Sequence, residues 1–270
     1  MMKDGVGRMD RRRRLESLAE NAEDAILLAR VYDRITAAER KQIPAATCFL
    51  SRREQALTEQ LLQGTEFCFF GGYVGAERAL CCYLPAYLAP EDWLHGEEGP
   101  VCALRAEFYA GDSLTHRDFL GALMGCGIKR ETVGDILVQR GRCDFLVTRE
   151  ILPYVRQTLE SAGRTRLRLS GIALEELEVP AQETRQLRDT VAALRLDSVV
   201  AAGFGLSRGR AAEAVTNGRT AVNWLTCEKP DRQVAEGDVI SVRGLGKIEL
   251  TAVGGTTKKG RIGVVISRFV

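Results

Sequence analysis

The sequence predicts an α+β protein with several domains. Its 270 residues suffice for two or three domains, and its 45% hydrophobic and 27% charged residues are typical of a globular chain. The spacing of apolar residues changes along the chain, from a helical period to short strand-like runs. We therefore expect a mostly helical or mixed N-terminal domain at 1–72, an α+β middle domain at 73–180 and a C-terminal domain at 181–270.

The N-terminal domain is predicted to be mainly helical. Apolar residues recur at three- and four-residue spacing over 10–39, and this helix ends before Pro44. Ser51 with Glu54 three residues later forms a capping box, which predicts a second helix that ends near Gly64.

The middle domain shows a regular β-α-β-β-α-β order, the ferredoxin-like arrangement that RNA-recognition motifs also use. An RNA-recognition motif stacks bases on several strand aromatics. Only Phe145 occupies such a position in RGRCDFLVT, so the sequence argues against base stacking on this sheet. Two further strands, 66–70 and 79–84, precede the pattern. The predicted elements are strand 101–109, helix 116–127 capped by Thr115, strands 133–139 and 143–148, helix 149–162 and strand 165–170.

The sequence lacks the residues that several classes of function require. The eight cysteines form no C-x-x-C pair and there are two histidines, so we expect no metal site and interpret the cysteines as buried thiols in a reducing cytosol. The glycines near Lys129 are not followed by Lys-Ser or Lys-Thr, so we expect no nucleotide cofactor. No apolar stretch approaches the roughly 18 residues of a membrane span.

Positive charge gathers in the C-terminal domain. Residues 181–270 hold 14 Lys/Arg against 9 Asp/Glu, net +5, whereas 1–180 hold 24 against 27, net −3. This asymmetry favours nucleic-acid contact at the C-terminal end.

The most informative pattern is RLDSVVAAGFGLSRGRAAEAVTNGRTAVNWLTCEKPDRQVAEGDVISV, residues 195–242. It predicts a short helix, a turn, a second helix capped by Ser207 and closed by Asn217-Gly218, and a strand that carries Asn223. Arg208 and Arg210 fall in the first turn of the second helix, where the helix dipole disfavours cations. A phosphate bound there would offset this conflict. The pattern places five cationic side chains at helix starts and turn edges: Arg208, Arg210, Arg219, Lys229 and Arg232.

The Arg195-Leu196-Asp197 triplet has an alternative interpretation. Pseudouridine synthases carry a catalytic Arg-Leu-Asp within a motif that has Thr where this chain has Val200. We therefore expect Asp197 to cap the helix that follows it. An RNA-modifying enzyme remains an alternative function.

Two weaker basic pairs lie outside this pattern. Lys129 and Arg130, at the exit of a helix, could contact RNA phosphates or complement the helix dipole. Lys258 and Lys259 are predicted at the tip of a C-terminal hairpin and are further candidates for secondary RNA contacts.

The ordered set of RLD, SR, NG, V-N and GD resembles the S4 domain, the RNA-binding domain named after a small-subunit ribosomal protein, over about residues 182–245. In that family the two helices present the Ser-Arg turn and nearby basic residues to RNA. The resemblance implies an RNA-binding role for Arg195, Ser207, Arg208, Arg210, Arg219, Asn223 and Lys229.

Residues 71–85 (GGYVGAERALCCYLP) and 114–138 (LTHRDFLGALMGCGIKRETVGDILV) resemble the bacterial YlmH family. This resemblance implies an N-terminal domain, a ferredoxin-like middle domain and a C-terminal S4 domain. It further implies a cytoplasmic protein without catalytic activity or cofactor, associated with the large ribosomal subunit, with stalled nascent chains on peptidyl-tRNA and with a cell-division gene neighbourhood.

The leading hypothesis is a non-enzymatic protein that binds rRNA of the large ribosomal subunit, with tRNA as a second ligand. A scaffold for division proteins with accessory RNA binding is the other alternative.

Overall fold

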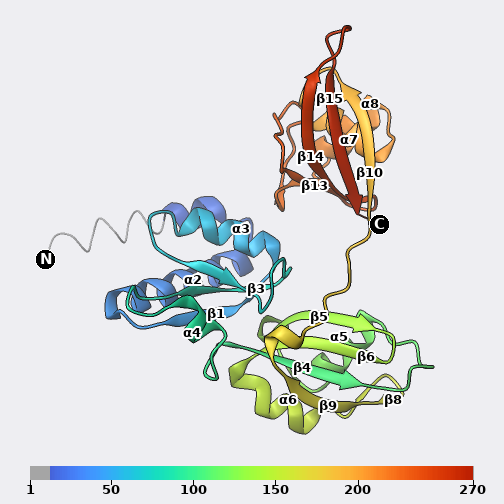
Figure 1. The fold of residues 1–270 in the computed structure, drawn as a ribbon. Helices are drawn as coiled ribbons and strands as arrows, with labels where there is room; N and C mark the ends of the chain where they lie inside the picture. The colour runs from blue at the N-terminus through green and yellow to red at the C-terminus, as the bar shows by residue number, and fades with distance from the viewer. Residues whose placement is uncertain (1–12, 270) are drawn as a thin grey trace, which may run out of the picture. The chain divides into compact units, whose positions relative to one another are not determined.

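The computed structural model describes residues 13–269. The chain forms two compact units, one ending at Pro180 and the other starting at Ala181 (Figure 1). Each unit combines helices with antiparallel sheets, which confirms the predicted α+β class.

The long helix of the first unit, α2 (Ala22–Lys41), begins later than predicted. Residues 13–18 are also helical, but 19–21 interrupt the two segments, and residues 10–12 of the predicted helix lie outside the described residues. Asn21 causes the interruption because its side chain accepts a hydrogen bond from the Asp24 amide at 2.8 Å, which starts a new helix. The second predicted helix, α3 (Arg52–Leu61), is confirmed together with its Ser51 cap and Glu54 capping box.

A three-stranded sheet supports these helices, in the order β1-β3-β2. Its strands are β1 (Ala45–Leu50), β2 (Cys68–Phe70) and β3 (Ala79–Tyr83). The sequence analysis did not assign β1, since six residues without clear alternation give a weak strand signal. The sheet also crosses the domain boundary expected at residue 72, because β3, which follows this boundary in the sequence, pairs with β1, which precedes it.

The two faces of this sheet have different partners. Val31 and Ile35 of α2 pack with Cys81 on one face, while Cys82 lies with Leu80 and Phe49 on the other. The adjacent cysteines therefore point to opposite faces, as strand geometry requires. Leu94 of the short helix α4 (Pro90–Leu94) joins the second face.

The middle of the chain has the predicted ferredoxin-like order. Its sheet runs β5-β6-β4-β9 with antiparallel neighbours. The strands are β4 (Val101–Glu107), β5 (Val133–Gln139), β6 (Arg142–Thr148) and β9 (Arg168–Ile172), and the helices are α5 (His116–Gly125) and α6 (Leu152–Thr158). The helix predicted at 149–162 is shorter, with a 3-10 turn η2 (Arg149–Ile151) before it and a minimal hairpin of β7 (Ser161–Ala162) and β8 (Thr165–Arg166) after it.

A glycine-containing loop at 71–78 is fastened to this sheet. The Asp135 carboxylate accepts hydrogen bonds from the Tyr73 hydroxyl at 2.7 Å and from the Glu77 and Arg78 amides at 2.7 and 3.0 Å. One carboxylate on β5 thus holds the start of β3, which links the two sheets of the first unit.

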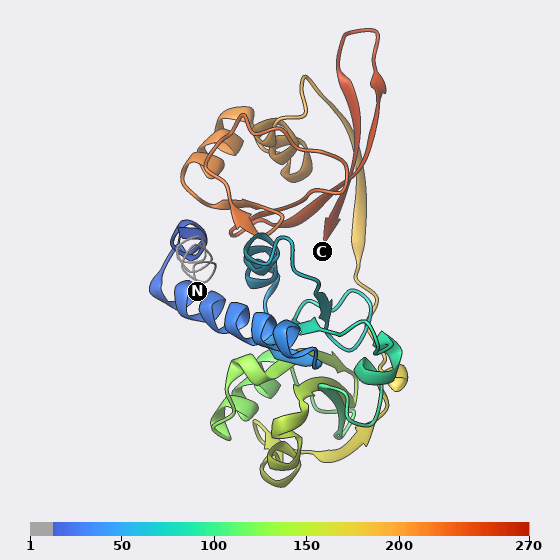
Figure 2. The same ribbon diagram turned by 90° about the vertical axis from the view of Figure 1, so that its left-hand side faces the viewer.

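The second unit is a six-stranded antiparallel sheet with two helices on one side (Figure 2). The sheet order is β10-β15-β14-β13-β11-β12. The helices are α7 (Leu196–Phe204) and α8 (Arg208–Thr216), and the strands are β10 (Thr184–Val191), β11 (Thr220–Val222), β12 (Leu225–Thr226), β13 (Val239–Val242), β14 (Gly246–Thr256) and β15 (Ile262–Phe269). The antiparallel pairing of β14 with β15 confirms the predicted C-terminal hairpin.

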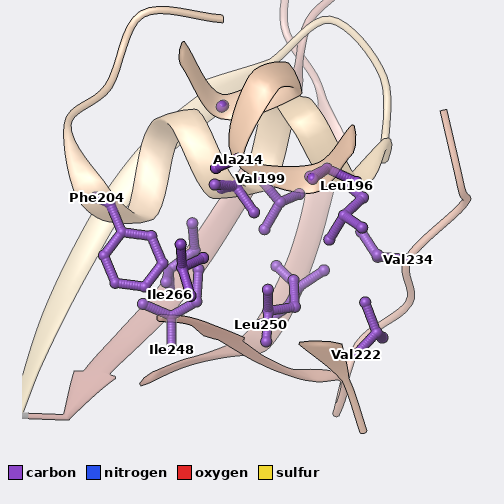
Figure 3. Packing of buried hydrophobic residues seen from close by; sticks show 14 of the residues in the cluster. Leu196, Val199, Phe204, Ala214, Val222, Val234, Ile248, Leu250 and Ile266 are labelled. Atoms are coloured by element: carbon purple, nitrogen blue, oxygen red, sulfur yellow. The ribbon is translucent and has the colours of Figure 1, made fainter. Parts of the chain in front are cut away.

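The core of the second unit lies between the helices and the sheet (Figure 3). Leu196 and Val199 of α7 are fully buried against Leu250 and Ile266 of the sheet. Gly203 allows a close approach of α7 to the sheet, because a Cβ at this position would lie 2.5 Å from Cδ1 of Ile248. This packing fixes the directions in which α7 and α8 begin.

Candidate nucleic-acid interface

Helix α8 begins at an exposed basic turn. The Ser207 hydroxyl accepts a hydrogen bond from the Arg210 amide at 3.4 Å, which confirms the predicted cap. Ser207, Arg208 and Arg210 are all exposed. The remaining amides of the first turn and the helix dipole attract an anion at this end.

A buried carboxylate connects the starts of the two helices. Asp197 is 3% exposed and accepts hydrogen bonds from Arg195 Nε and Nη2, at 3.2 and 3.1 Å, and from Arg208 Nε at 3.3 Å. Burial raises the pKa of this carboxyl, but the hydrogen bonds from the two arginines outweigh burial and lower it overall. Asp197 therefore stays ionised and holds both guanidinium groups in place.

The expectation that Asp197 caps its helix is wrong. The amides of Leu196 and Asp197 donate to the carbonyl oxygens of Arg232 and Pro230, at 2.9 and 3.0 Å. The loop between β12 and β13 thus occupies the start of α7, and the Asp197 side chain is left for the arginines. This carboxylate is enclosed by its partners rather than open to a nucleotide, which disfavours the catalytic interpretation of the Arg-Leu-Asp triplet.

The same loop carries two of the predicted binding residues. Lys229 and Arg232 are exposed, and the Arg232 amide donates to the Lys229 carbonyl at 3.1 Å. The loop backbone that carries them lies against the start of α7, next to Arg195. We call the set Arg195, Arg208, Arg210, Lys229 and Arg232 the helix-start group.

Arg219 and Asn223 lie apart from the helix-start group. Arg219 follows the far end of α8, about 13 Å of helix from Arg208, and its Nη2 donates to the Arg243 carbonyl at 2.8 Å. Asn223 is not in a strand: its φ of 50° places it in the turn between β11 and β12. Its side chain bonds to Asp238 at 2.8 Å and to the Val239 amide at 3.0 Å.

The hairpin tip is a third position. Lys258 and Lys259 are exposed in the turn between β14 and β15, as predicted. The Arg261 Nε donates to the Thr190 hydroxyl at 2.8 Å, which fastens the base of this turn to β10.

Comparisons with known proteins identify two domains in the chain. Residues 194–240 match the family described as "S4 domain", and residues 108–176 match "Putative RNA-binding domain in YlmH". A Bacillus subtilis protein named "Ribosome-associated protein quality control protein P2" is 36% identical over 226 residues, which cover 82% of this chain and 86% of the relative. The chain belongs to the YlmH family.

A solved structure titled "Cell division protein ylmH from Streptococcus pneumoniae" is 23% identical, with a TM-score of 0.49, and covers 60% of this chain and 98% of that one.

Within residues 13–269 no helix is long and apolar enough to cross a bilayer. Nor do three or more His, Cys, Asp or Glu side chains gather as metal ligands in the described part of the chain.

The sheet of the YlmH-type middle domain does not offer a base-stacking surface. Phe145 is fully buried with Phe119 of α5 and Val155 of α6, so its ring lies beneath the helices. On the other face, Ala103 and Leu146 pack against the first sheet. Both faces near this aromatic are therefore closed to a nucleotide.

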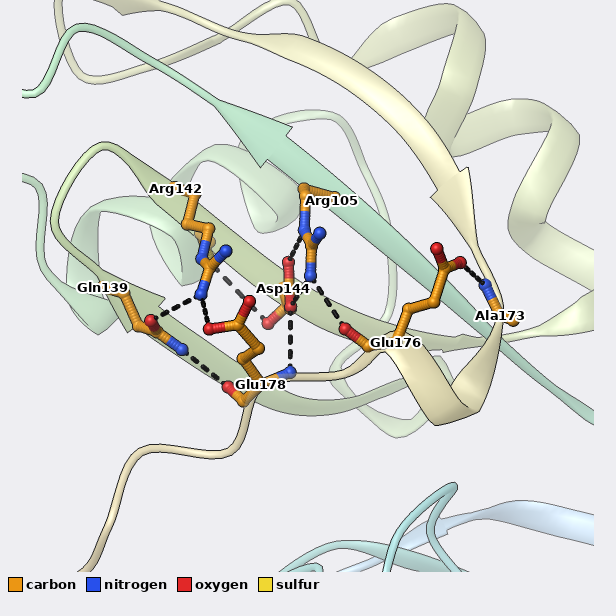
Figure 4. Close-up of polar contacts among 8 residues, drawn as sticks. Arg105, Gln139, Arg142, Asp144, Ala173, Glu176 and Glu178 are labelled. Carbon is orange, nitrogen blue, oxygen red and sulfur yellow. Dashed lines mark hydrogen bonds and ion pairs between the residues drawn. The ribbon is translucent and has the colours of Figure 1, made fainter.

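The rest of that second face is covered by the segment 173–178 (Figure 4). Arg105 and Asp144, on neighbouring strands, form a bidentate ion pair at 2.7 Å for both bonds. The Glu176 carbonyl accepts from Arg105 Nη2 at 2.9 Å, and the Glu178 carboxylate pairs with Arg142. In this YlmH-family chain Arg105, Arg142 and Asp144 of the sheet are thus already paired.

Lys129 and Arg130 lie between α5 and β5 in the YlmH-type domain. Lys129 is exposed, whereas Arg130 is half-buried and donates from Nη1 to the Val133 and Gly134 carbonyls at 2.6 and 3.2 Å. These carbonyls belong to β5, so Arg130 does not complement the end of α5. The 3-10 turn η1 (Arg130–Thr132) places this guanidinium beside β5.

Sequence reasoning missed the organising role of Asp197 and any role for Arg78. The signal for Asp197 was available, since an Arg-Leu-Asp triplet precedes a Ser-Arg pair by one helix and one turn. Arg78 offered no local signal, because its partners Phe49 and Val133 are distant in the sequence.

Proposed function

We propose that this YlmH-family protein is a non-enzymatic RNA-binding protein of the large ribosomal subunit. Its helix-start group would contact rRNA phosphates, with tRNA as a second ligand, during the handling of stalled ribosomes and their nascent chains. The name of the Bacillus subtilis relative supports the ribosomal and quality-control parts of the proposal.

One observation carries the proposal: a single buried carboxylate, Asp197, holds Arg195 and Arg208 at the starts of two helices. Three further exposed cations lie on the first turn of α8 and on the loop bonded to the start of α7. Planar guanidinium groups and free helix amides are suited to phosphate oxygens. Because Arg195 and Arg208 are held by Asp197, little side-chain entropy remains to be lost on binding, which favours affinity. Contacts of this kind position a protein on folded RNA through phosphate and shape.

The first test is ultraviolet crosslinking in cells with sequencing of the bound RNA. Crosslinks concentrated on one helix of large-subunit rRNA, with or without tRNA, would support the proposal. Crosslinks that are dispersed or absent would overturn it and favour a scaffold for division proteins.

The second test assigns the residues. The double variant Arg208→Gln/Arg210→Gln should weaken co-sedimentation with large subunits and reduce the dependence of log K on log salt by roughly one for each lost phosphate contact. The matched control is Arg185→Gln/Arg188→Gln, which removes the same charge from exposed positions on β10. An equal loss of affinity in both double variants would show that the effect comes from net charge alone.

A further inference from the structure

A second group of cations lies in the first unit, where two arginines distant in sequence come together. Arg78 precedes β3 and Arg130 opens η1, and Arg78 Nη2 donates to the Arg130 carbonyl at 3.4 Å. With Arg30 and Lys129 they line a cavity of about 610 Å³. We call this cavity the arginine cavity.

Backbone carbonyls, rather than carboxylates, orient both guanidinium groups. Arg78 donates from Nε to the Val133 carbonyl at 3.0 Å and from Nη2 to the Phe49 carbonyl at 2.8 Å. Arg130 uses only Nη1, as described above. A guanidinium has five N–H donors, so Nη1 of Arg78 and both Nε and Nη2 of Arg130 have no partner among the described residues.

Other arginines of the same unit are neutralised differently. Arg53 and Arg105 each form a bidentate pair with a buried aspartate, and these hydrogen bonds raise the pKa of both guanidinium groups. Burial instead lowers the pKa of Arg78, and burial followed by the charge of Arg78 lowers the pKa of Arg130 to about 10. The positive charge of Arg78 thus disfavours the charged form of Arg130, and the charges of Asp135 and Glu54 offset this only in part.

The nearest carboxylates are already committed to the backbone. Glu54 accepts from the Ser51 amide at 2.5 Å, and Asp135 holds the loop that precedes Arg78. Arg30 lies 3.9 Å from Glu131, a long contact between two exposed groups. The lining thus holds four cations against the carboxylates of Glu54 and Glu131, and an anion would relieve the repulsion.

We propose that the arginine cavity binds a phosphate group of an RNA strand. The proposal rests on the proposed function, because it takes RNA as the source of the phosphate. The forked donors of two arginines match phosphate oxygens, and exposed Lys129 lies beside them. Phe49 is the one aromatic residue of the lining and is 1% exposed, so it offers no platform for a base. A phosphodiester whose base stays outside fits this lining better than a free nucleotide.

The test measures binding of the full chain to a fluorescein-labelled RNA hairpin by fluorescence anisotropy over a series of salt concentrations. Arg130→Gln should weaken binding roughly tenfold and reduce the salt slope by roughly one. The matched control is Arg117→Gln, which removes an exposed arginine of α5 outside the cavity and should leave both values unchanged. Lys129→Gln, at an exposed side chain, guards against loss of folding in Arg130→Gln and should lower the slope in the same direction.

Each outcome separates this site from the helix-start group. If Arg208→Gln/Arg210→Gln weakens binding while Arg130→Gln and Lys129→Gln match the wild type, the cavity proposal fails and the proposed function stands. If the wild type does not bind the hairpin, both fail. A further arm adds inorganic phosphate and follows thermal unfolding. Stabilisation of the wild type but not of Arg130→Gln, with unchanged RNA affinity, would overturn RNA as the ligand in favour of free phosphate.

Discussion

Replacing Asp197 by asparagine tests how the helix-start group is held together. The change keeps the shape of the side chain but removes the charge that Arg195 and Arg208 share. It also places the N–H donors of the asparagine amide against the N–H donors of the guanidinium groups. A hydrogen bond to a charged group contributes about 1.5–3 kcal/mol. Because the side chains of Arg195 and Arg208 are 33% and 59% exposed, solvent screens both pairs. We therefore expect Asp197→Asn to lower the free energy of unfolding of the second unit by about 2 kcal/mol.

The assay follows the fluorescence of Trp224, the tryptophan of the second unit. The chain has two tryptophans, Trp93 in the first unit and Trp224 in the second, so a Trp93→Phe background leaves fluorescence to report on the second unit. A loss of about 2 kcal/mol corresponds to a fall in Tm of roughly 8–16 °C for a unit of this size. Glu213→Gln, at an exposed carboxylate of α8, is the control and should change stability by less than about 0.5 kcal/mol.

The pH dependence gives a second, independent readout. The pKa of Asp197 is lower in the folded state, so its contribution is present above the ordinary aspartate value of about 3.9 and is lost as the pH falls through the folded value. The stability difference between wild type and Asp197→Asn should be constant near neutral pH and shrink in acid. A difference that persists unchanged in acid, or a variant as stable as the wild type at neutral pH, would refute the reasoning.

Three further predictions concern packing and capping. Gly203→Ala should lower the free energy of unfolding by about 1–3 kcal/mol, because its Cβ would collide with Ile248. Gly209→Ala has open space around it and should instead stabilise α8 by about 0.5 kcal/mol. Urea unfolding of the two variants should therefore show changes in stability of opposite sign. Ser207→Ala should lower the free energy of unfolding by about 1 kcal/mol through loss of the helix cap. A variant as stable in urea as the wild type would contradict this prediction. Phe145→Ala should cost about 3–5 kcal/mol in thermal unfolding, while Phe145→Leu, which keeps the fold, should leave RNA affinity unchanged; a selective loss of RNA affinity would contradict its buried position.

Local signals in the sequence determined much of the fold. Caps such as Ser51 and Ser207 act within three residues, so they can be recognised without the tertiary structure. The β-α-β-β-α-β order and the C-terminal hairpin follow from periodicity and turn residues in the same way. The basic turn at Arg208 was equally visible, because its charge and its cap are neighbours in the chain.

Tertiary structure alone decided what those elements face. The sequence could not show that segment 173–178 covers one face of the middle sheet, since both faces of its strands carry apolar residues. Asp197 looked like a cap until a loop more than thirty residues later supplied the carbonyls for its helix. Arg78 and Arg130 share a cavity because Asp135 and β5 bring their loops together. Long-range pairing sets such contacts, and no short-range pattern encodes it.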